Sequence, residues 1–264
     1  MSFGRFFRGI TSFPSPVTIH PSWFQGRTAY GGLSTALLHE SLASQVSLAP
    51  LRSLQVTFVG PVLGESPLCL ESKLLRTGKS VALVRGEGLQ DGDTKIAALG
   101  AFGMKRDSVI RVVPERVQFL NQAAFDAHPV SAFDEKKWPG FCRNFEYKYL
   151  TSEAFSGTKE TVMRGYVRHA TESEEASPAS RLLALIDAWP SPVLPMLDQP
   201  CNASSLTMSV DIVHEDVGVA DGEWVQYESR VRHSESGYAT VGERVWSMEG
   251  ELLAISQQNV VHFA

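Results

Sequence analysis

A single aspartate stands in an otherwise apolar stretch, "RLLALIDAWPSP", over residues 181–192. The residues around Asp187 are predicted to form a helix with leucine, isoleucine and tryptophan on nearly every side. An ionised carboxylate in such surroundings is costly unless another group pairs with it or a reaction uses it. The alternative is that Asp187 points to solvent from the polar edge of an ordinary amphipathic helix. Asp187 is therefore the first candidate for acid–base chemistry.

Other signatures of catalysis are missing from the sequence. It contains no glycine-rich nucleotide-binding loop and no GxSxG motif, which removes the usual α/β-hydrolase route to ester cleavage. Cys69, Cys142 and Cys201 are far apart and odd in number, so neither a disulfide framework nor a thiolate metal site is expected. Five histidines show no metal-ligand spacing and are predicted to be surface or capping residues: His39, His128, His169, His214 and His233. We expect no metal ion and no bound cofactor.

The elements that would position Asp187 belong to the second of two similar halves. In the first half, residues 26–46 are a glycine-rich turn followed by a helix with apolar residues on more than one side. Residues 51–62 alternate as a strand does, and residues 67–104 divide into three further strands at "RTGKS" and "DGD".

The second half repeats this order of parts. The helix that carries Asp187, which Ser177 or Ser180 could cap, precedes a strand within 204–215 and three more strands within 223–263. The runs "FEYKYL" and "VMRGYVRHA" are predicted to be the opening strands of this half. Self-similarity at this scale indicates a duplicated α+β unit, with one domain at 1–110 and the second at 111–264.

Bulk composition limits the classes of function. The chain has 264 residues, 43% hydrophobic and 20% charged, with a net charge of −5. This composition is typical of a soluble globular protein, and its mild acidity argues against nucleic-acid binding. The N-terminus lacks the apolar core of a signal peptide, and no run is long enough to span a membrane. We expect a cytoplasmic protein with no nucleic-acid or membrane partner.

Four stretches in this order resemble the type II acyl-CoA thioesterases, the TesB-like proteins: "AYGGLSTALL", "SLQVTFVGPV", "LLALIDAWPSP" and "GELLAISQQNVV". The resemblance extends from about Gly26 to Val261 and implies a double hotdog, in which two tandem helix-wrapped antiparallel sheets form one α+β chain. It also implies three catalytic side chains in the C-terminal hotdog. These are Asp187, Gln258 on the final strand, and a hydroxyl group. Ser205 is the first choice for this hydroxyl, and Thr207 is the reserve because it is expected on the same face of the strand, two residues on.

The chemistry of thioester hydrolysis suits these residue types. A buried carboxylate has a raised pKa and can take a proton from the attacking water. An amide at Gln258 and a hydroxyl at Ser205 can hold that water without competing for its proton. Gly31 and Gly32, at the start of the first helix, would offer backbone N–H groups to the oxyanion and bind the acyl group closely.

The resemblance leaves alternatives for function. The leading hypothesis is hydrolysis of a small-molecule acyl-CoA to free acid and coenzyme A. A non-catalytic hotdog that binds acyl groups or coenzyme A, or acts as a scaffold, is the alternative. A hotdog hydratase is less favoured because no histidine of the required kind is evident on the predicted helices. Hotdog proteins usually pair, so a homodimer or a higher homo-oligomer is expected.

Overall fold

In the computed structural model, residues 1–264 are described except 9, 11–12, 48, 214–218 and 264. Most strands join one 11-stranded sheet in the order β1-β5-β6-β7-β4-β10-β13-β12-β11-β9-β8, and a short separate pair is β2-β3. The first-half strands are β1 (Ser15–Val17), β2 (Phe24–Gln25), β3 (Thr28–Ala29), β4 (Leu51–Phe58), β5 (Leu68–Thr77), β6 (Val81–Gln90) and β7 (Asp93–Gly103). The second-half strands are β8 (Phe145–Tyr149), β9 (Val162–His169), β10 (Ala203–Ile212), β11 (Val225–Glu235), β12 (Tyr238–Trp246) and β13 (Leu252–His262).

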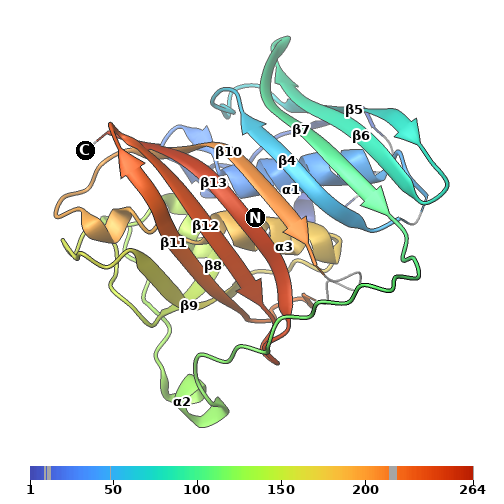
Figure 1. Ribbon diagram of the computed structural model, residues 1–264. Helices are drawn as coiled ribbons and strands as arrows, with labels where there is room; N and C mark the ends of the chain where they lie inside the picture. The colour runs from blue at the N-terminus through green and yellow to red at the C-terminus, as the bar shows by residue number, and fades with distance from the viewer. Residues whose placement is uncertain (9, 11–12, 48, 214–218, 264) are drawn as a thin grey trace.

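Three α-helices and four short 3₁₀ helices complete the described elements. They are α1 (Gly31–Ala43), α2 (Gln122–Ala127), α3 (Pro178–Ala188), η1 (Gly4–Phe6), η2 (Pro21–Trp23), η3 (Gly140–Asn144) and η4 (Leu194–Met196). Figure 1 shows α1 and α3 side by side against one face of the sheet. The core lies between these two helices and that face.

The two halves of the sheet join at its centre. Strand β4 pairs antiparallel with β10, and Val56 lies opposite Met208. On either side the order is the same, with β7, β6 and β5 following β4, and β13, β12 and β11 following β10. The "DGD" segment forms the predicted hairpin, because Asp91 and Gly92 both have positive φ angles, as a type I′ turn requires. The structure therefore has the two expected tandem units of helix and antiparallel strands, and their strands join edge to edge in one continuous sheet.

Helices α1 and α3 run antiparallel and contact each other along their lengths. Ser177 caps α3 by accepting a hydrogen bond from the Ser180 backbone N–H at 3.2 Å. The Ser180 side chain in turn donates to the carbonyl of Ala36, in the middle of α1, at 3.1 Å. The start of α3 thus lies beside the second half of α1. This direction brings the end of α3, where Asp187 lies, to the start of α1.

The segment between the halves crosses the molecule from β7 to α2 (Figure 1). Val117 and Phe119 fasten it to the second half, through hydrogen bonds to Gly250 O at 3.0 Å and to Gln226 Oε1 at 2.9 Å. The domain boundary that we place at residue 110 falls in this segment and stays a prediction. Among the described residues, no helix is long and apolar enough to cross a membrane.

Candidate active site

Three tyrosines hold the end of α3 in place. The last carbonyl groups of a helix lack partners within it, and a buried carbonyl without a partner is costly. Here buried tyrosine hydroxyls donate to the last turn: Tyr30 to Ala184 O, Tyr227 to Ile186 O at 2.8 Å, and Tyr147 to Ala188 O at 3.0 Å. The hydroxyls come from both halves of the chain, so the backbone around Asp187 is fixed by the tertiary structure.

The carboxylate of Asp187 lies against the first residues of α1. A Cβ atom built on Gly31 would be 2.9 Å from Asp187 Oδ2 and 2.9 Å from the ring of Phe58. Burial raises the pKa of Asp187 to about 6, although a hydrogen bond from the backbone N–H of Gly32 acts in the opposite direction. Asp187 therefore faces the other helix rather than pointing away to solvent, and it is a carboxylate near the pKa that a general base requires.

Ser205 and Gln258 form a direct pair on neighbouring strands. The Ser205 hydroxyl donates a hydrogen bond to Gln258 Oε1 at 2.6 Å, and the Gln258 side chain is only 5% exposed. Gln257 is exposed on the opposite face of β13, as strand alternation predicts.

The expectation that Thr207 shares the face of Ser205 is wrong. The register of β10 against β13 shifts between these two residues, which marks a β-bulge. The extra residue reverses the alternation, so Thr207 is exposed while Met208 and Val210 point into the core. Thr207 therefore stays outside the group of side chains around Gln258.

Glu243 is a site residue that sequence reasoning missed. It lies on β12 and is 4% exposed, and its two carboxyl oxygens accept hydrogen bonds from Gln258 Nε2 at 3.2 and 3.4 Å. Burial, with a smaller contribution from the negative charge of Asp187, raises the pKa of Glu243 to about 7. Strict alternation along β12 could have found it, because Glu243 stands between the buried Val241 and Val245 on the same face.

The candidate side chains lie in two groups, one formed by Ser205, Gln258 and Glu243 and the other by Asp187 alone. Ser205, Gln258 and Glu243 form one hydrogen-bonded chain. Asp187 is close enough to Glu243 for its charge to act on it, but among the described residues no hydrogen bond links Asp187 to Ser205 or Gln258. Of the two glycines expected to bind an oxyanion, Gly32 directs its N–H to Asp187.

The histidines do not enter this group. His39 and His169 are each 3% exposed, so the prediction that they lie at the surface or at caps is wrong for both, and His214 lies outside the described residues. His39 bonds to Ser180 at 2.8 Å, two turns of α1 away from Gly31, which is about 12 Å along the helix axis. A histidine–aspartate pair of the hydratase kind is therefore not formed by His39 and Asp187. No group of three or more His, Cys, Asp or Glu among the described residues could hold a metal ion.

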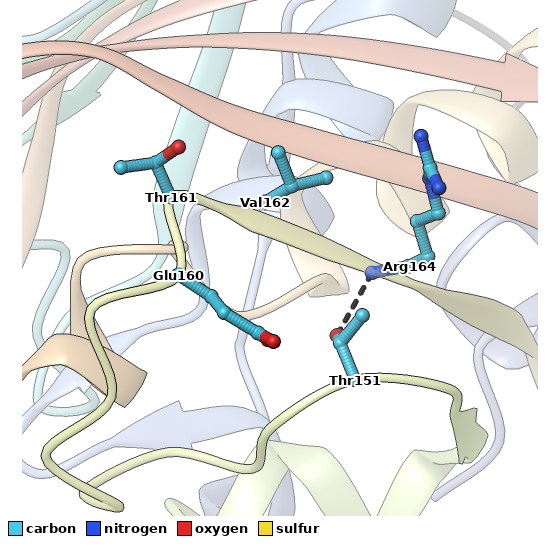
Figure 2. Close-up of a pocket in the computed structure, with 5 residues that line it drawn as sticks. All are labelled: Thr151, Glu160, Thr161, Val162 and Arg164. Carbon is cyan, nitrogen blue, oxygen red and sulfur yellow. Dashed lines mark hydrogen bonds between the residues drawn. The ribbon is translucent and has the colours of Figure 1, made fainter.

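Two surface cavities lie away from these residues. One, of about 280 Å³, is on the β9 side of the sheet and is lined by Thr151, Glu160, Thr161, Val162 and Arg164 (Figure 2). The Arg164 backbone N–H donates to Thr151 across its rim at 3.1 Å. The other, of about 390 Å³, is bordered by the N-terminal segment and the end of α1, including Phe7, Phe13 and Glu40. Neither cavity is lined by Asp187, Ser205 or Gln258.

Comparison with known protein families agrees with the geometry. Residues 19–103 match the acyl-CoA thioesterase N-terminal domain, and residues 125–262 match the acyl-CoA thioesterase C-terminal domain. The chain belongs to the acyl-CoA thioesterase family. A search of curated protein sequences gives no significant match to the chain.

Solved structures show the fold of this acyl-CoA thioesterase family member. A hot dog fold protein of unknown function from Alicyclobacillus acidocaldarius superimposes with a TM-score of 0.83 at 20% identity, covering 94% of this chain and 92% of its own. A putative thioesterase II from Thermobifida fusca gives 0.78 at 17% identity, with the same coverage of 94% and 92%. A tesB protein from Mycobacterium avium subspecies paratuberculosis gives 0.70 at 16% identity, covering 89% and 88%. The fold is a double hotdog.

Proposed function

We propose that this protein hydrolyses acyl-CoA thioesters to a free acid and coenzyme A, with Asp187 as the general base. The observation that carries the proposal is the position of Asp187, a carboxylate that is largely enclosed yet keeps some exposure and is fixed at the meeting point of two helix ends. Its pKa of about 6 makes it ionised at neutral pH while leaving it basic enough to accept a proton. The family match to acyl-CoA thioesterase domains supports the substrate class.

The reaction needs one water and returns every proton. Asp187 takes a proton from the water as its oxygen attacks the thioester carbonyl carbon, and the carbonyl oxygen becomes an oxyanion. As the carbonyl re-forms, the carbon–sulfur bond breaks, and Asp187 returns the proton to the leaving sulfur of coenzyme A. The first N–H groups of α1 point out of its N-terminus, which favours negative charge there. Because Gly32 already serves Asp187, the Gly31 N–H is the donor that we assign to the oxyanion.

Ser205 and Gln258 would hold the water. Ser205 donates its hydroxyl hydrogen to a hydrogen bond with Gln258 Oε1. The lone pairs of the Ser205 oxygen are therefore free to accept a hydrogen bond from the water. Fixing the second hydrogen in this way leaves the first to Asp187, which lowers the orientational cost of the attack.

The proposal is tested by thiol release from short, medium, long and aromatic acyl-CoAs. We expect Asp187→Asn to lower kcat by at least about a hundredfold with unchanged folding, because the amide cannot accept the proton. Asp211→Asn is the matched control, since Asp211 is exposed on β10, and it should keep full activity. Binding of coenzyme A by titration calorimetry with no thiol release from any substrate would instead favour the non-catalytic alternative. The homo-oligomeric state and the cytoplasmic location stay predictions.

A further inference from the structure

Glu243 is a buried carboxyl group that the hydrolytic steps above do not use. The fold does not require it, because the corresponding strand of the first half, β6, buries small or apolar residues on this face until its last residue, Gln90. These are Ala82, Val84, Gly86 and Gly88. At Gly86, for example, the space is filled by Leu38 and Leu42 of α1. A buried acid with no structural counterpart calls for a local explanation, since its burial is costly.

The contacts of Glu243 decide which way the Gln258 amide is turned. Gln258 Nε2 faces Glu243, at 3.2 and 3.4 Å from its two oxygens, and Gln258 Oε1 therefore faces Ser205 at 2.6 Å. If the amide were turned over, the Ser205 hydroxyl would have to donate elsewhere, and its oxygen would accept from the amide instead of from a water. The orientation of one amide thus sets the direction of the Ser205 hydroxyl.

A count of the hydrogens available to Glu243 indicates whether its carboxyl group is protonated. Tyr227 has one hydroxyl hydrogen, which it donates to the carbonyl oxygen of Ile186 at 2.8 Å. That carbonyl can only accept. In this arrangement Tyr227 has no second hydrogen for Glu243, and none of the salt bridges between described residues gives this 4% exposed carboxyl group a cation, which favours its neutral form.

The charges that surround Glu243 agree with this count. Its titratable neighbours are Asp187 from α3, Tyr227 from β11 and Tyr30 ahead of α1. Burial holds the pKa of both tyrosines well above the usual value, so they stay neutral. Burial raises the pKa of both carboxyl groups, to about 6 for Asp187 and about 7 for Glu243, and the negative charge of Asp187 acts in the same direction on Glu243. Ionisation of both would place two negative charges together in a buried site.

We infer that Glu243 is a positioning residue that works as a neutral carboxylic acid: it holds the Gln258 amide with its oxygen toward Ser205 and leaves Asp187 as the only negative charge of the site. The inference deepens the proposed thioester hydrolysis and rests on it for its functional meaning. The protonation state itself is a property of the folded protein and can be measured without substrate.

The first experiment is a pH titration of the whole protein by difference infrared spectroscopy. The carbonyl stretch of a protonated carboxyl group should persist above the pH at which Asp187 ionises, and Glu243→Gln should remove it. Glu71→Gln, which alters an exposed glutamate on β5, is the matched control and should leave the band unchanged. A wild-type spectrum without this band at pH values just above 6, or a band that survives in Glu243→Gln, would overturn the inference.

The second experiment uses the kinetics of acyl-CoA hydrolysis. Glu243→Gln keeps an oxygen that accepts and an N–H that donates, so its kcat should stay within about threefold of wild type near pH 6.5. Glu243→Leu removes both, and its kcat should fall by about tenfold or more with KM changed less than about twofold. The wild-type rate should decline again as Glu243 ionises, and Glu243→Gln should lack this decline. A Glu243→Leu variant that is folded and fully active would contradict the positioning role.

The two experiments separate the inference from the proposed function. If the wild type releases no thiol from any acyl-CoA, the function fails while the infrared result still decides the state of Glu243. If activity depends on Asp187 but Glu243→Gln retains the alkaline decline of the wild type, the inference fails and the function stands. Should Glu243→Leu not fold, the infrared titration and the pH profile of Glu243→Gln still decide whether Glu243 works as a neutral acid.

Discussion

Gly31 and Asp187 are more than 150 residues apart in sequence, yet a Cβ atom on Gly31 would lie 2.9 Å from Asp187 Oδ2. This separation is shorter than an ordinary contact between these atoms, so glycine lets the carboxylate lie at the N-terminus of α1 without being displaced. The N–H of Gly32 then partly offsets the cost of burying the charge. The absence of a side chain at Gly31 is thus a condition for the position of the proposed base, Asp187.

Gly31→Ala should impair the proposed reaction more than the fold. The added methyl group would lie 2.9 Å from both the Asp187 carboxylate and the Phe58 ring, so both must shift, and a misplaced base loses its alignment with the water. We expect kcat to fall by about tenfold or more, which corresponds to about 1.4 kcal/mol of transition-state stabilisation. Gly60→Ala is the control, since its Cβ would meet only Lys95 at 3.7 Å. Equal activity of the two variants would show that the close approach is unimportant.

Asp187→Asn should stabilise the folded protein in a pH-dependent way. The pKa of Asp187 is raised on folding, from an ordinary 3.8 to about 6, so ionisation favours the unfolded chain. The resulting destabilisation is complete above about pH 6 and disappears as the pH falls below about 4, where both states are protonated. The variant should therefore gain on the order of 2 kcal/mol of unfolding free energy near pH 8.

Denaturant unfolding of wild type and Asp187→Asn at several pH values measures this gain. The gain should shrink toward zero in acid. A difference in unfolding free energy that is constant at all pH values, or a variant that is less stable than wild type at high pH, would contradict the raised pKa of Asp187 in the folded protein.

Ser205→Ala and Thr207→Ala should differ although both remove a hydroxyl from β10. Ser205 bonds to Gln258 at 2.6 Å, whereas Thr207 is exposed on the other face. We expect the first variant to lower kcat by about tenfold and the second to leave it unchanged. Steady-state assays with one acyl-CoA are sufficient. Loss of activity in Thr207→Ala but not in Ser205→Ala would contradict the assignment of the catalytic hydroxyl to Ser205.

Tyr147→Phe should weaken the anchoring of α3. The change leaves the carbonyl oxygen of Ala188 without its 3.0 Å hydrogen bond, and such a loss in a buried place costs about 1–3 kcal/mol. The melting temperature should fall by about 2–4 °C for each kcal/mol in a protein of this size. Tyr238→Phe, at an exposed position on β12, is the control and should melt as the wild type does. Identical melting of the two variants would contradict the anchoring role.

Local patterns in the sequence were sufficient for the elements and for part of the site. The alternation of apolar residues identified β4 and β10, and it assigned Gln257 and Gln258 to opposite faces of the final strand, which the structure confirms. The run of apolar residues around Asp187 predicted α3, and Ser177 was one of two caps proposed for it. These inferences succeeded because helix and strand periods repeat within a few residues and depend on nearby side chains.

Only the tertiary structure decided which polar groups meet. The bulge between Ser205 and Thr207 breaks the period of two, and a single extra residue leaves no reliable mark in the sequence. Glu243 resembles any charged residue of a strand until its neighbours on β11, β13 and α3 are known. By itself the sequence determined the duplicated α+β elements and the presence of an acid in an apolar helix. The antiparallel packing of α1 on α3 decided that this acid faces a helix N-terminus, because that contact joins residues from opposite halves of the chain.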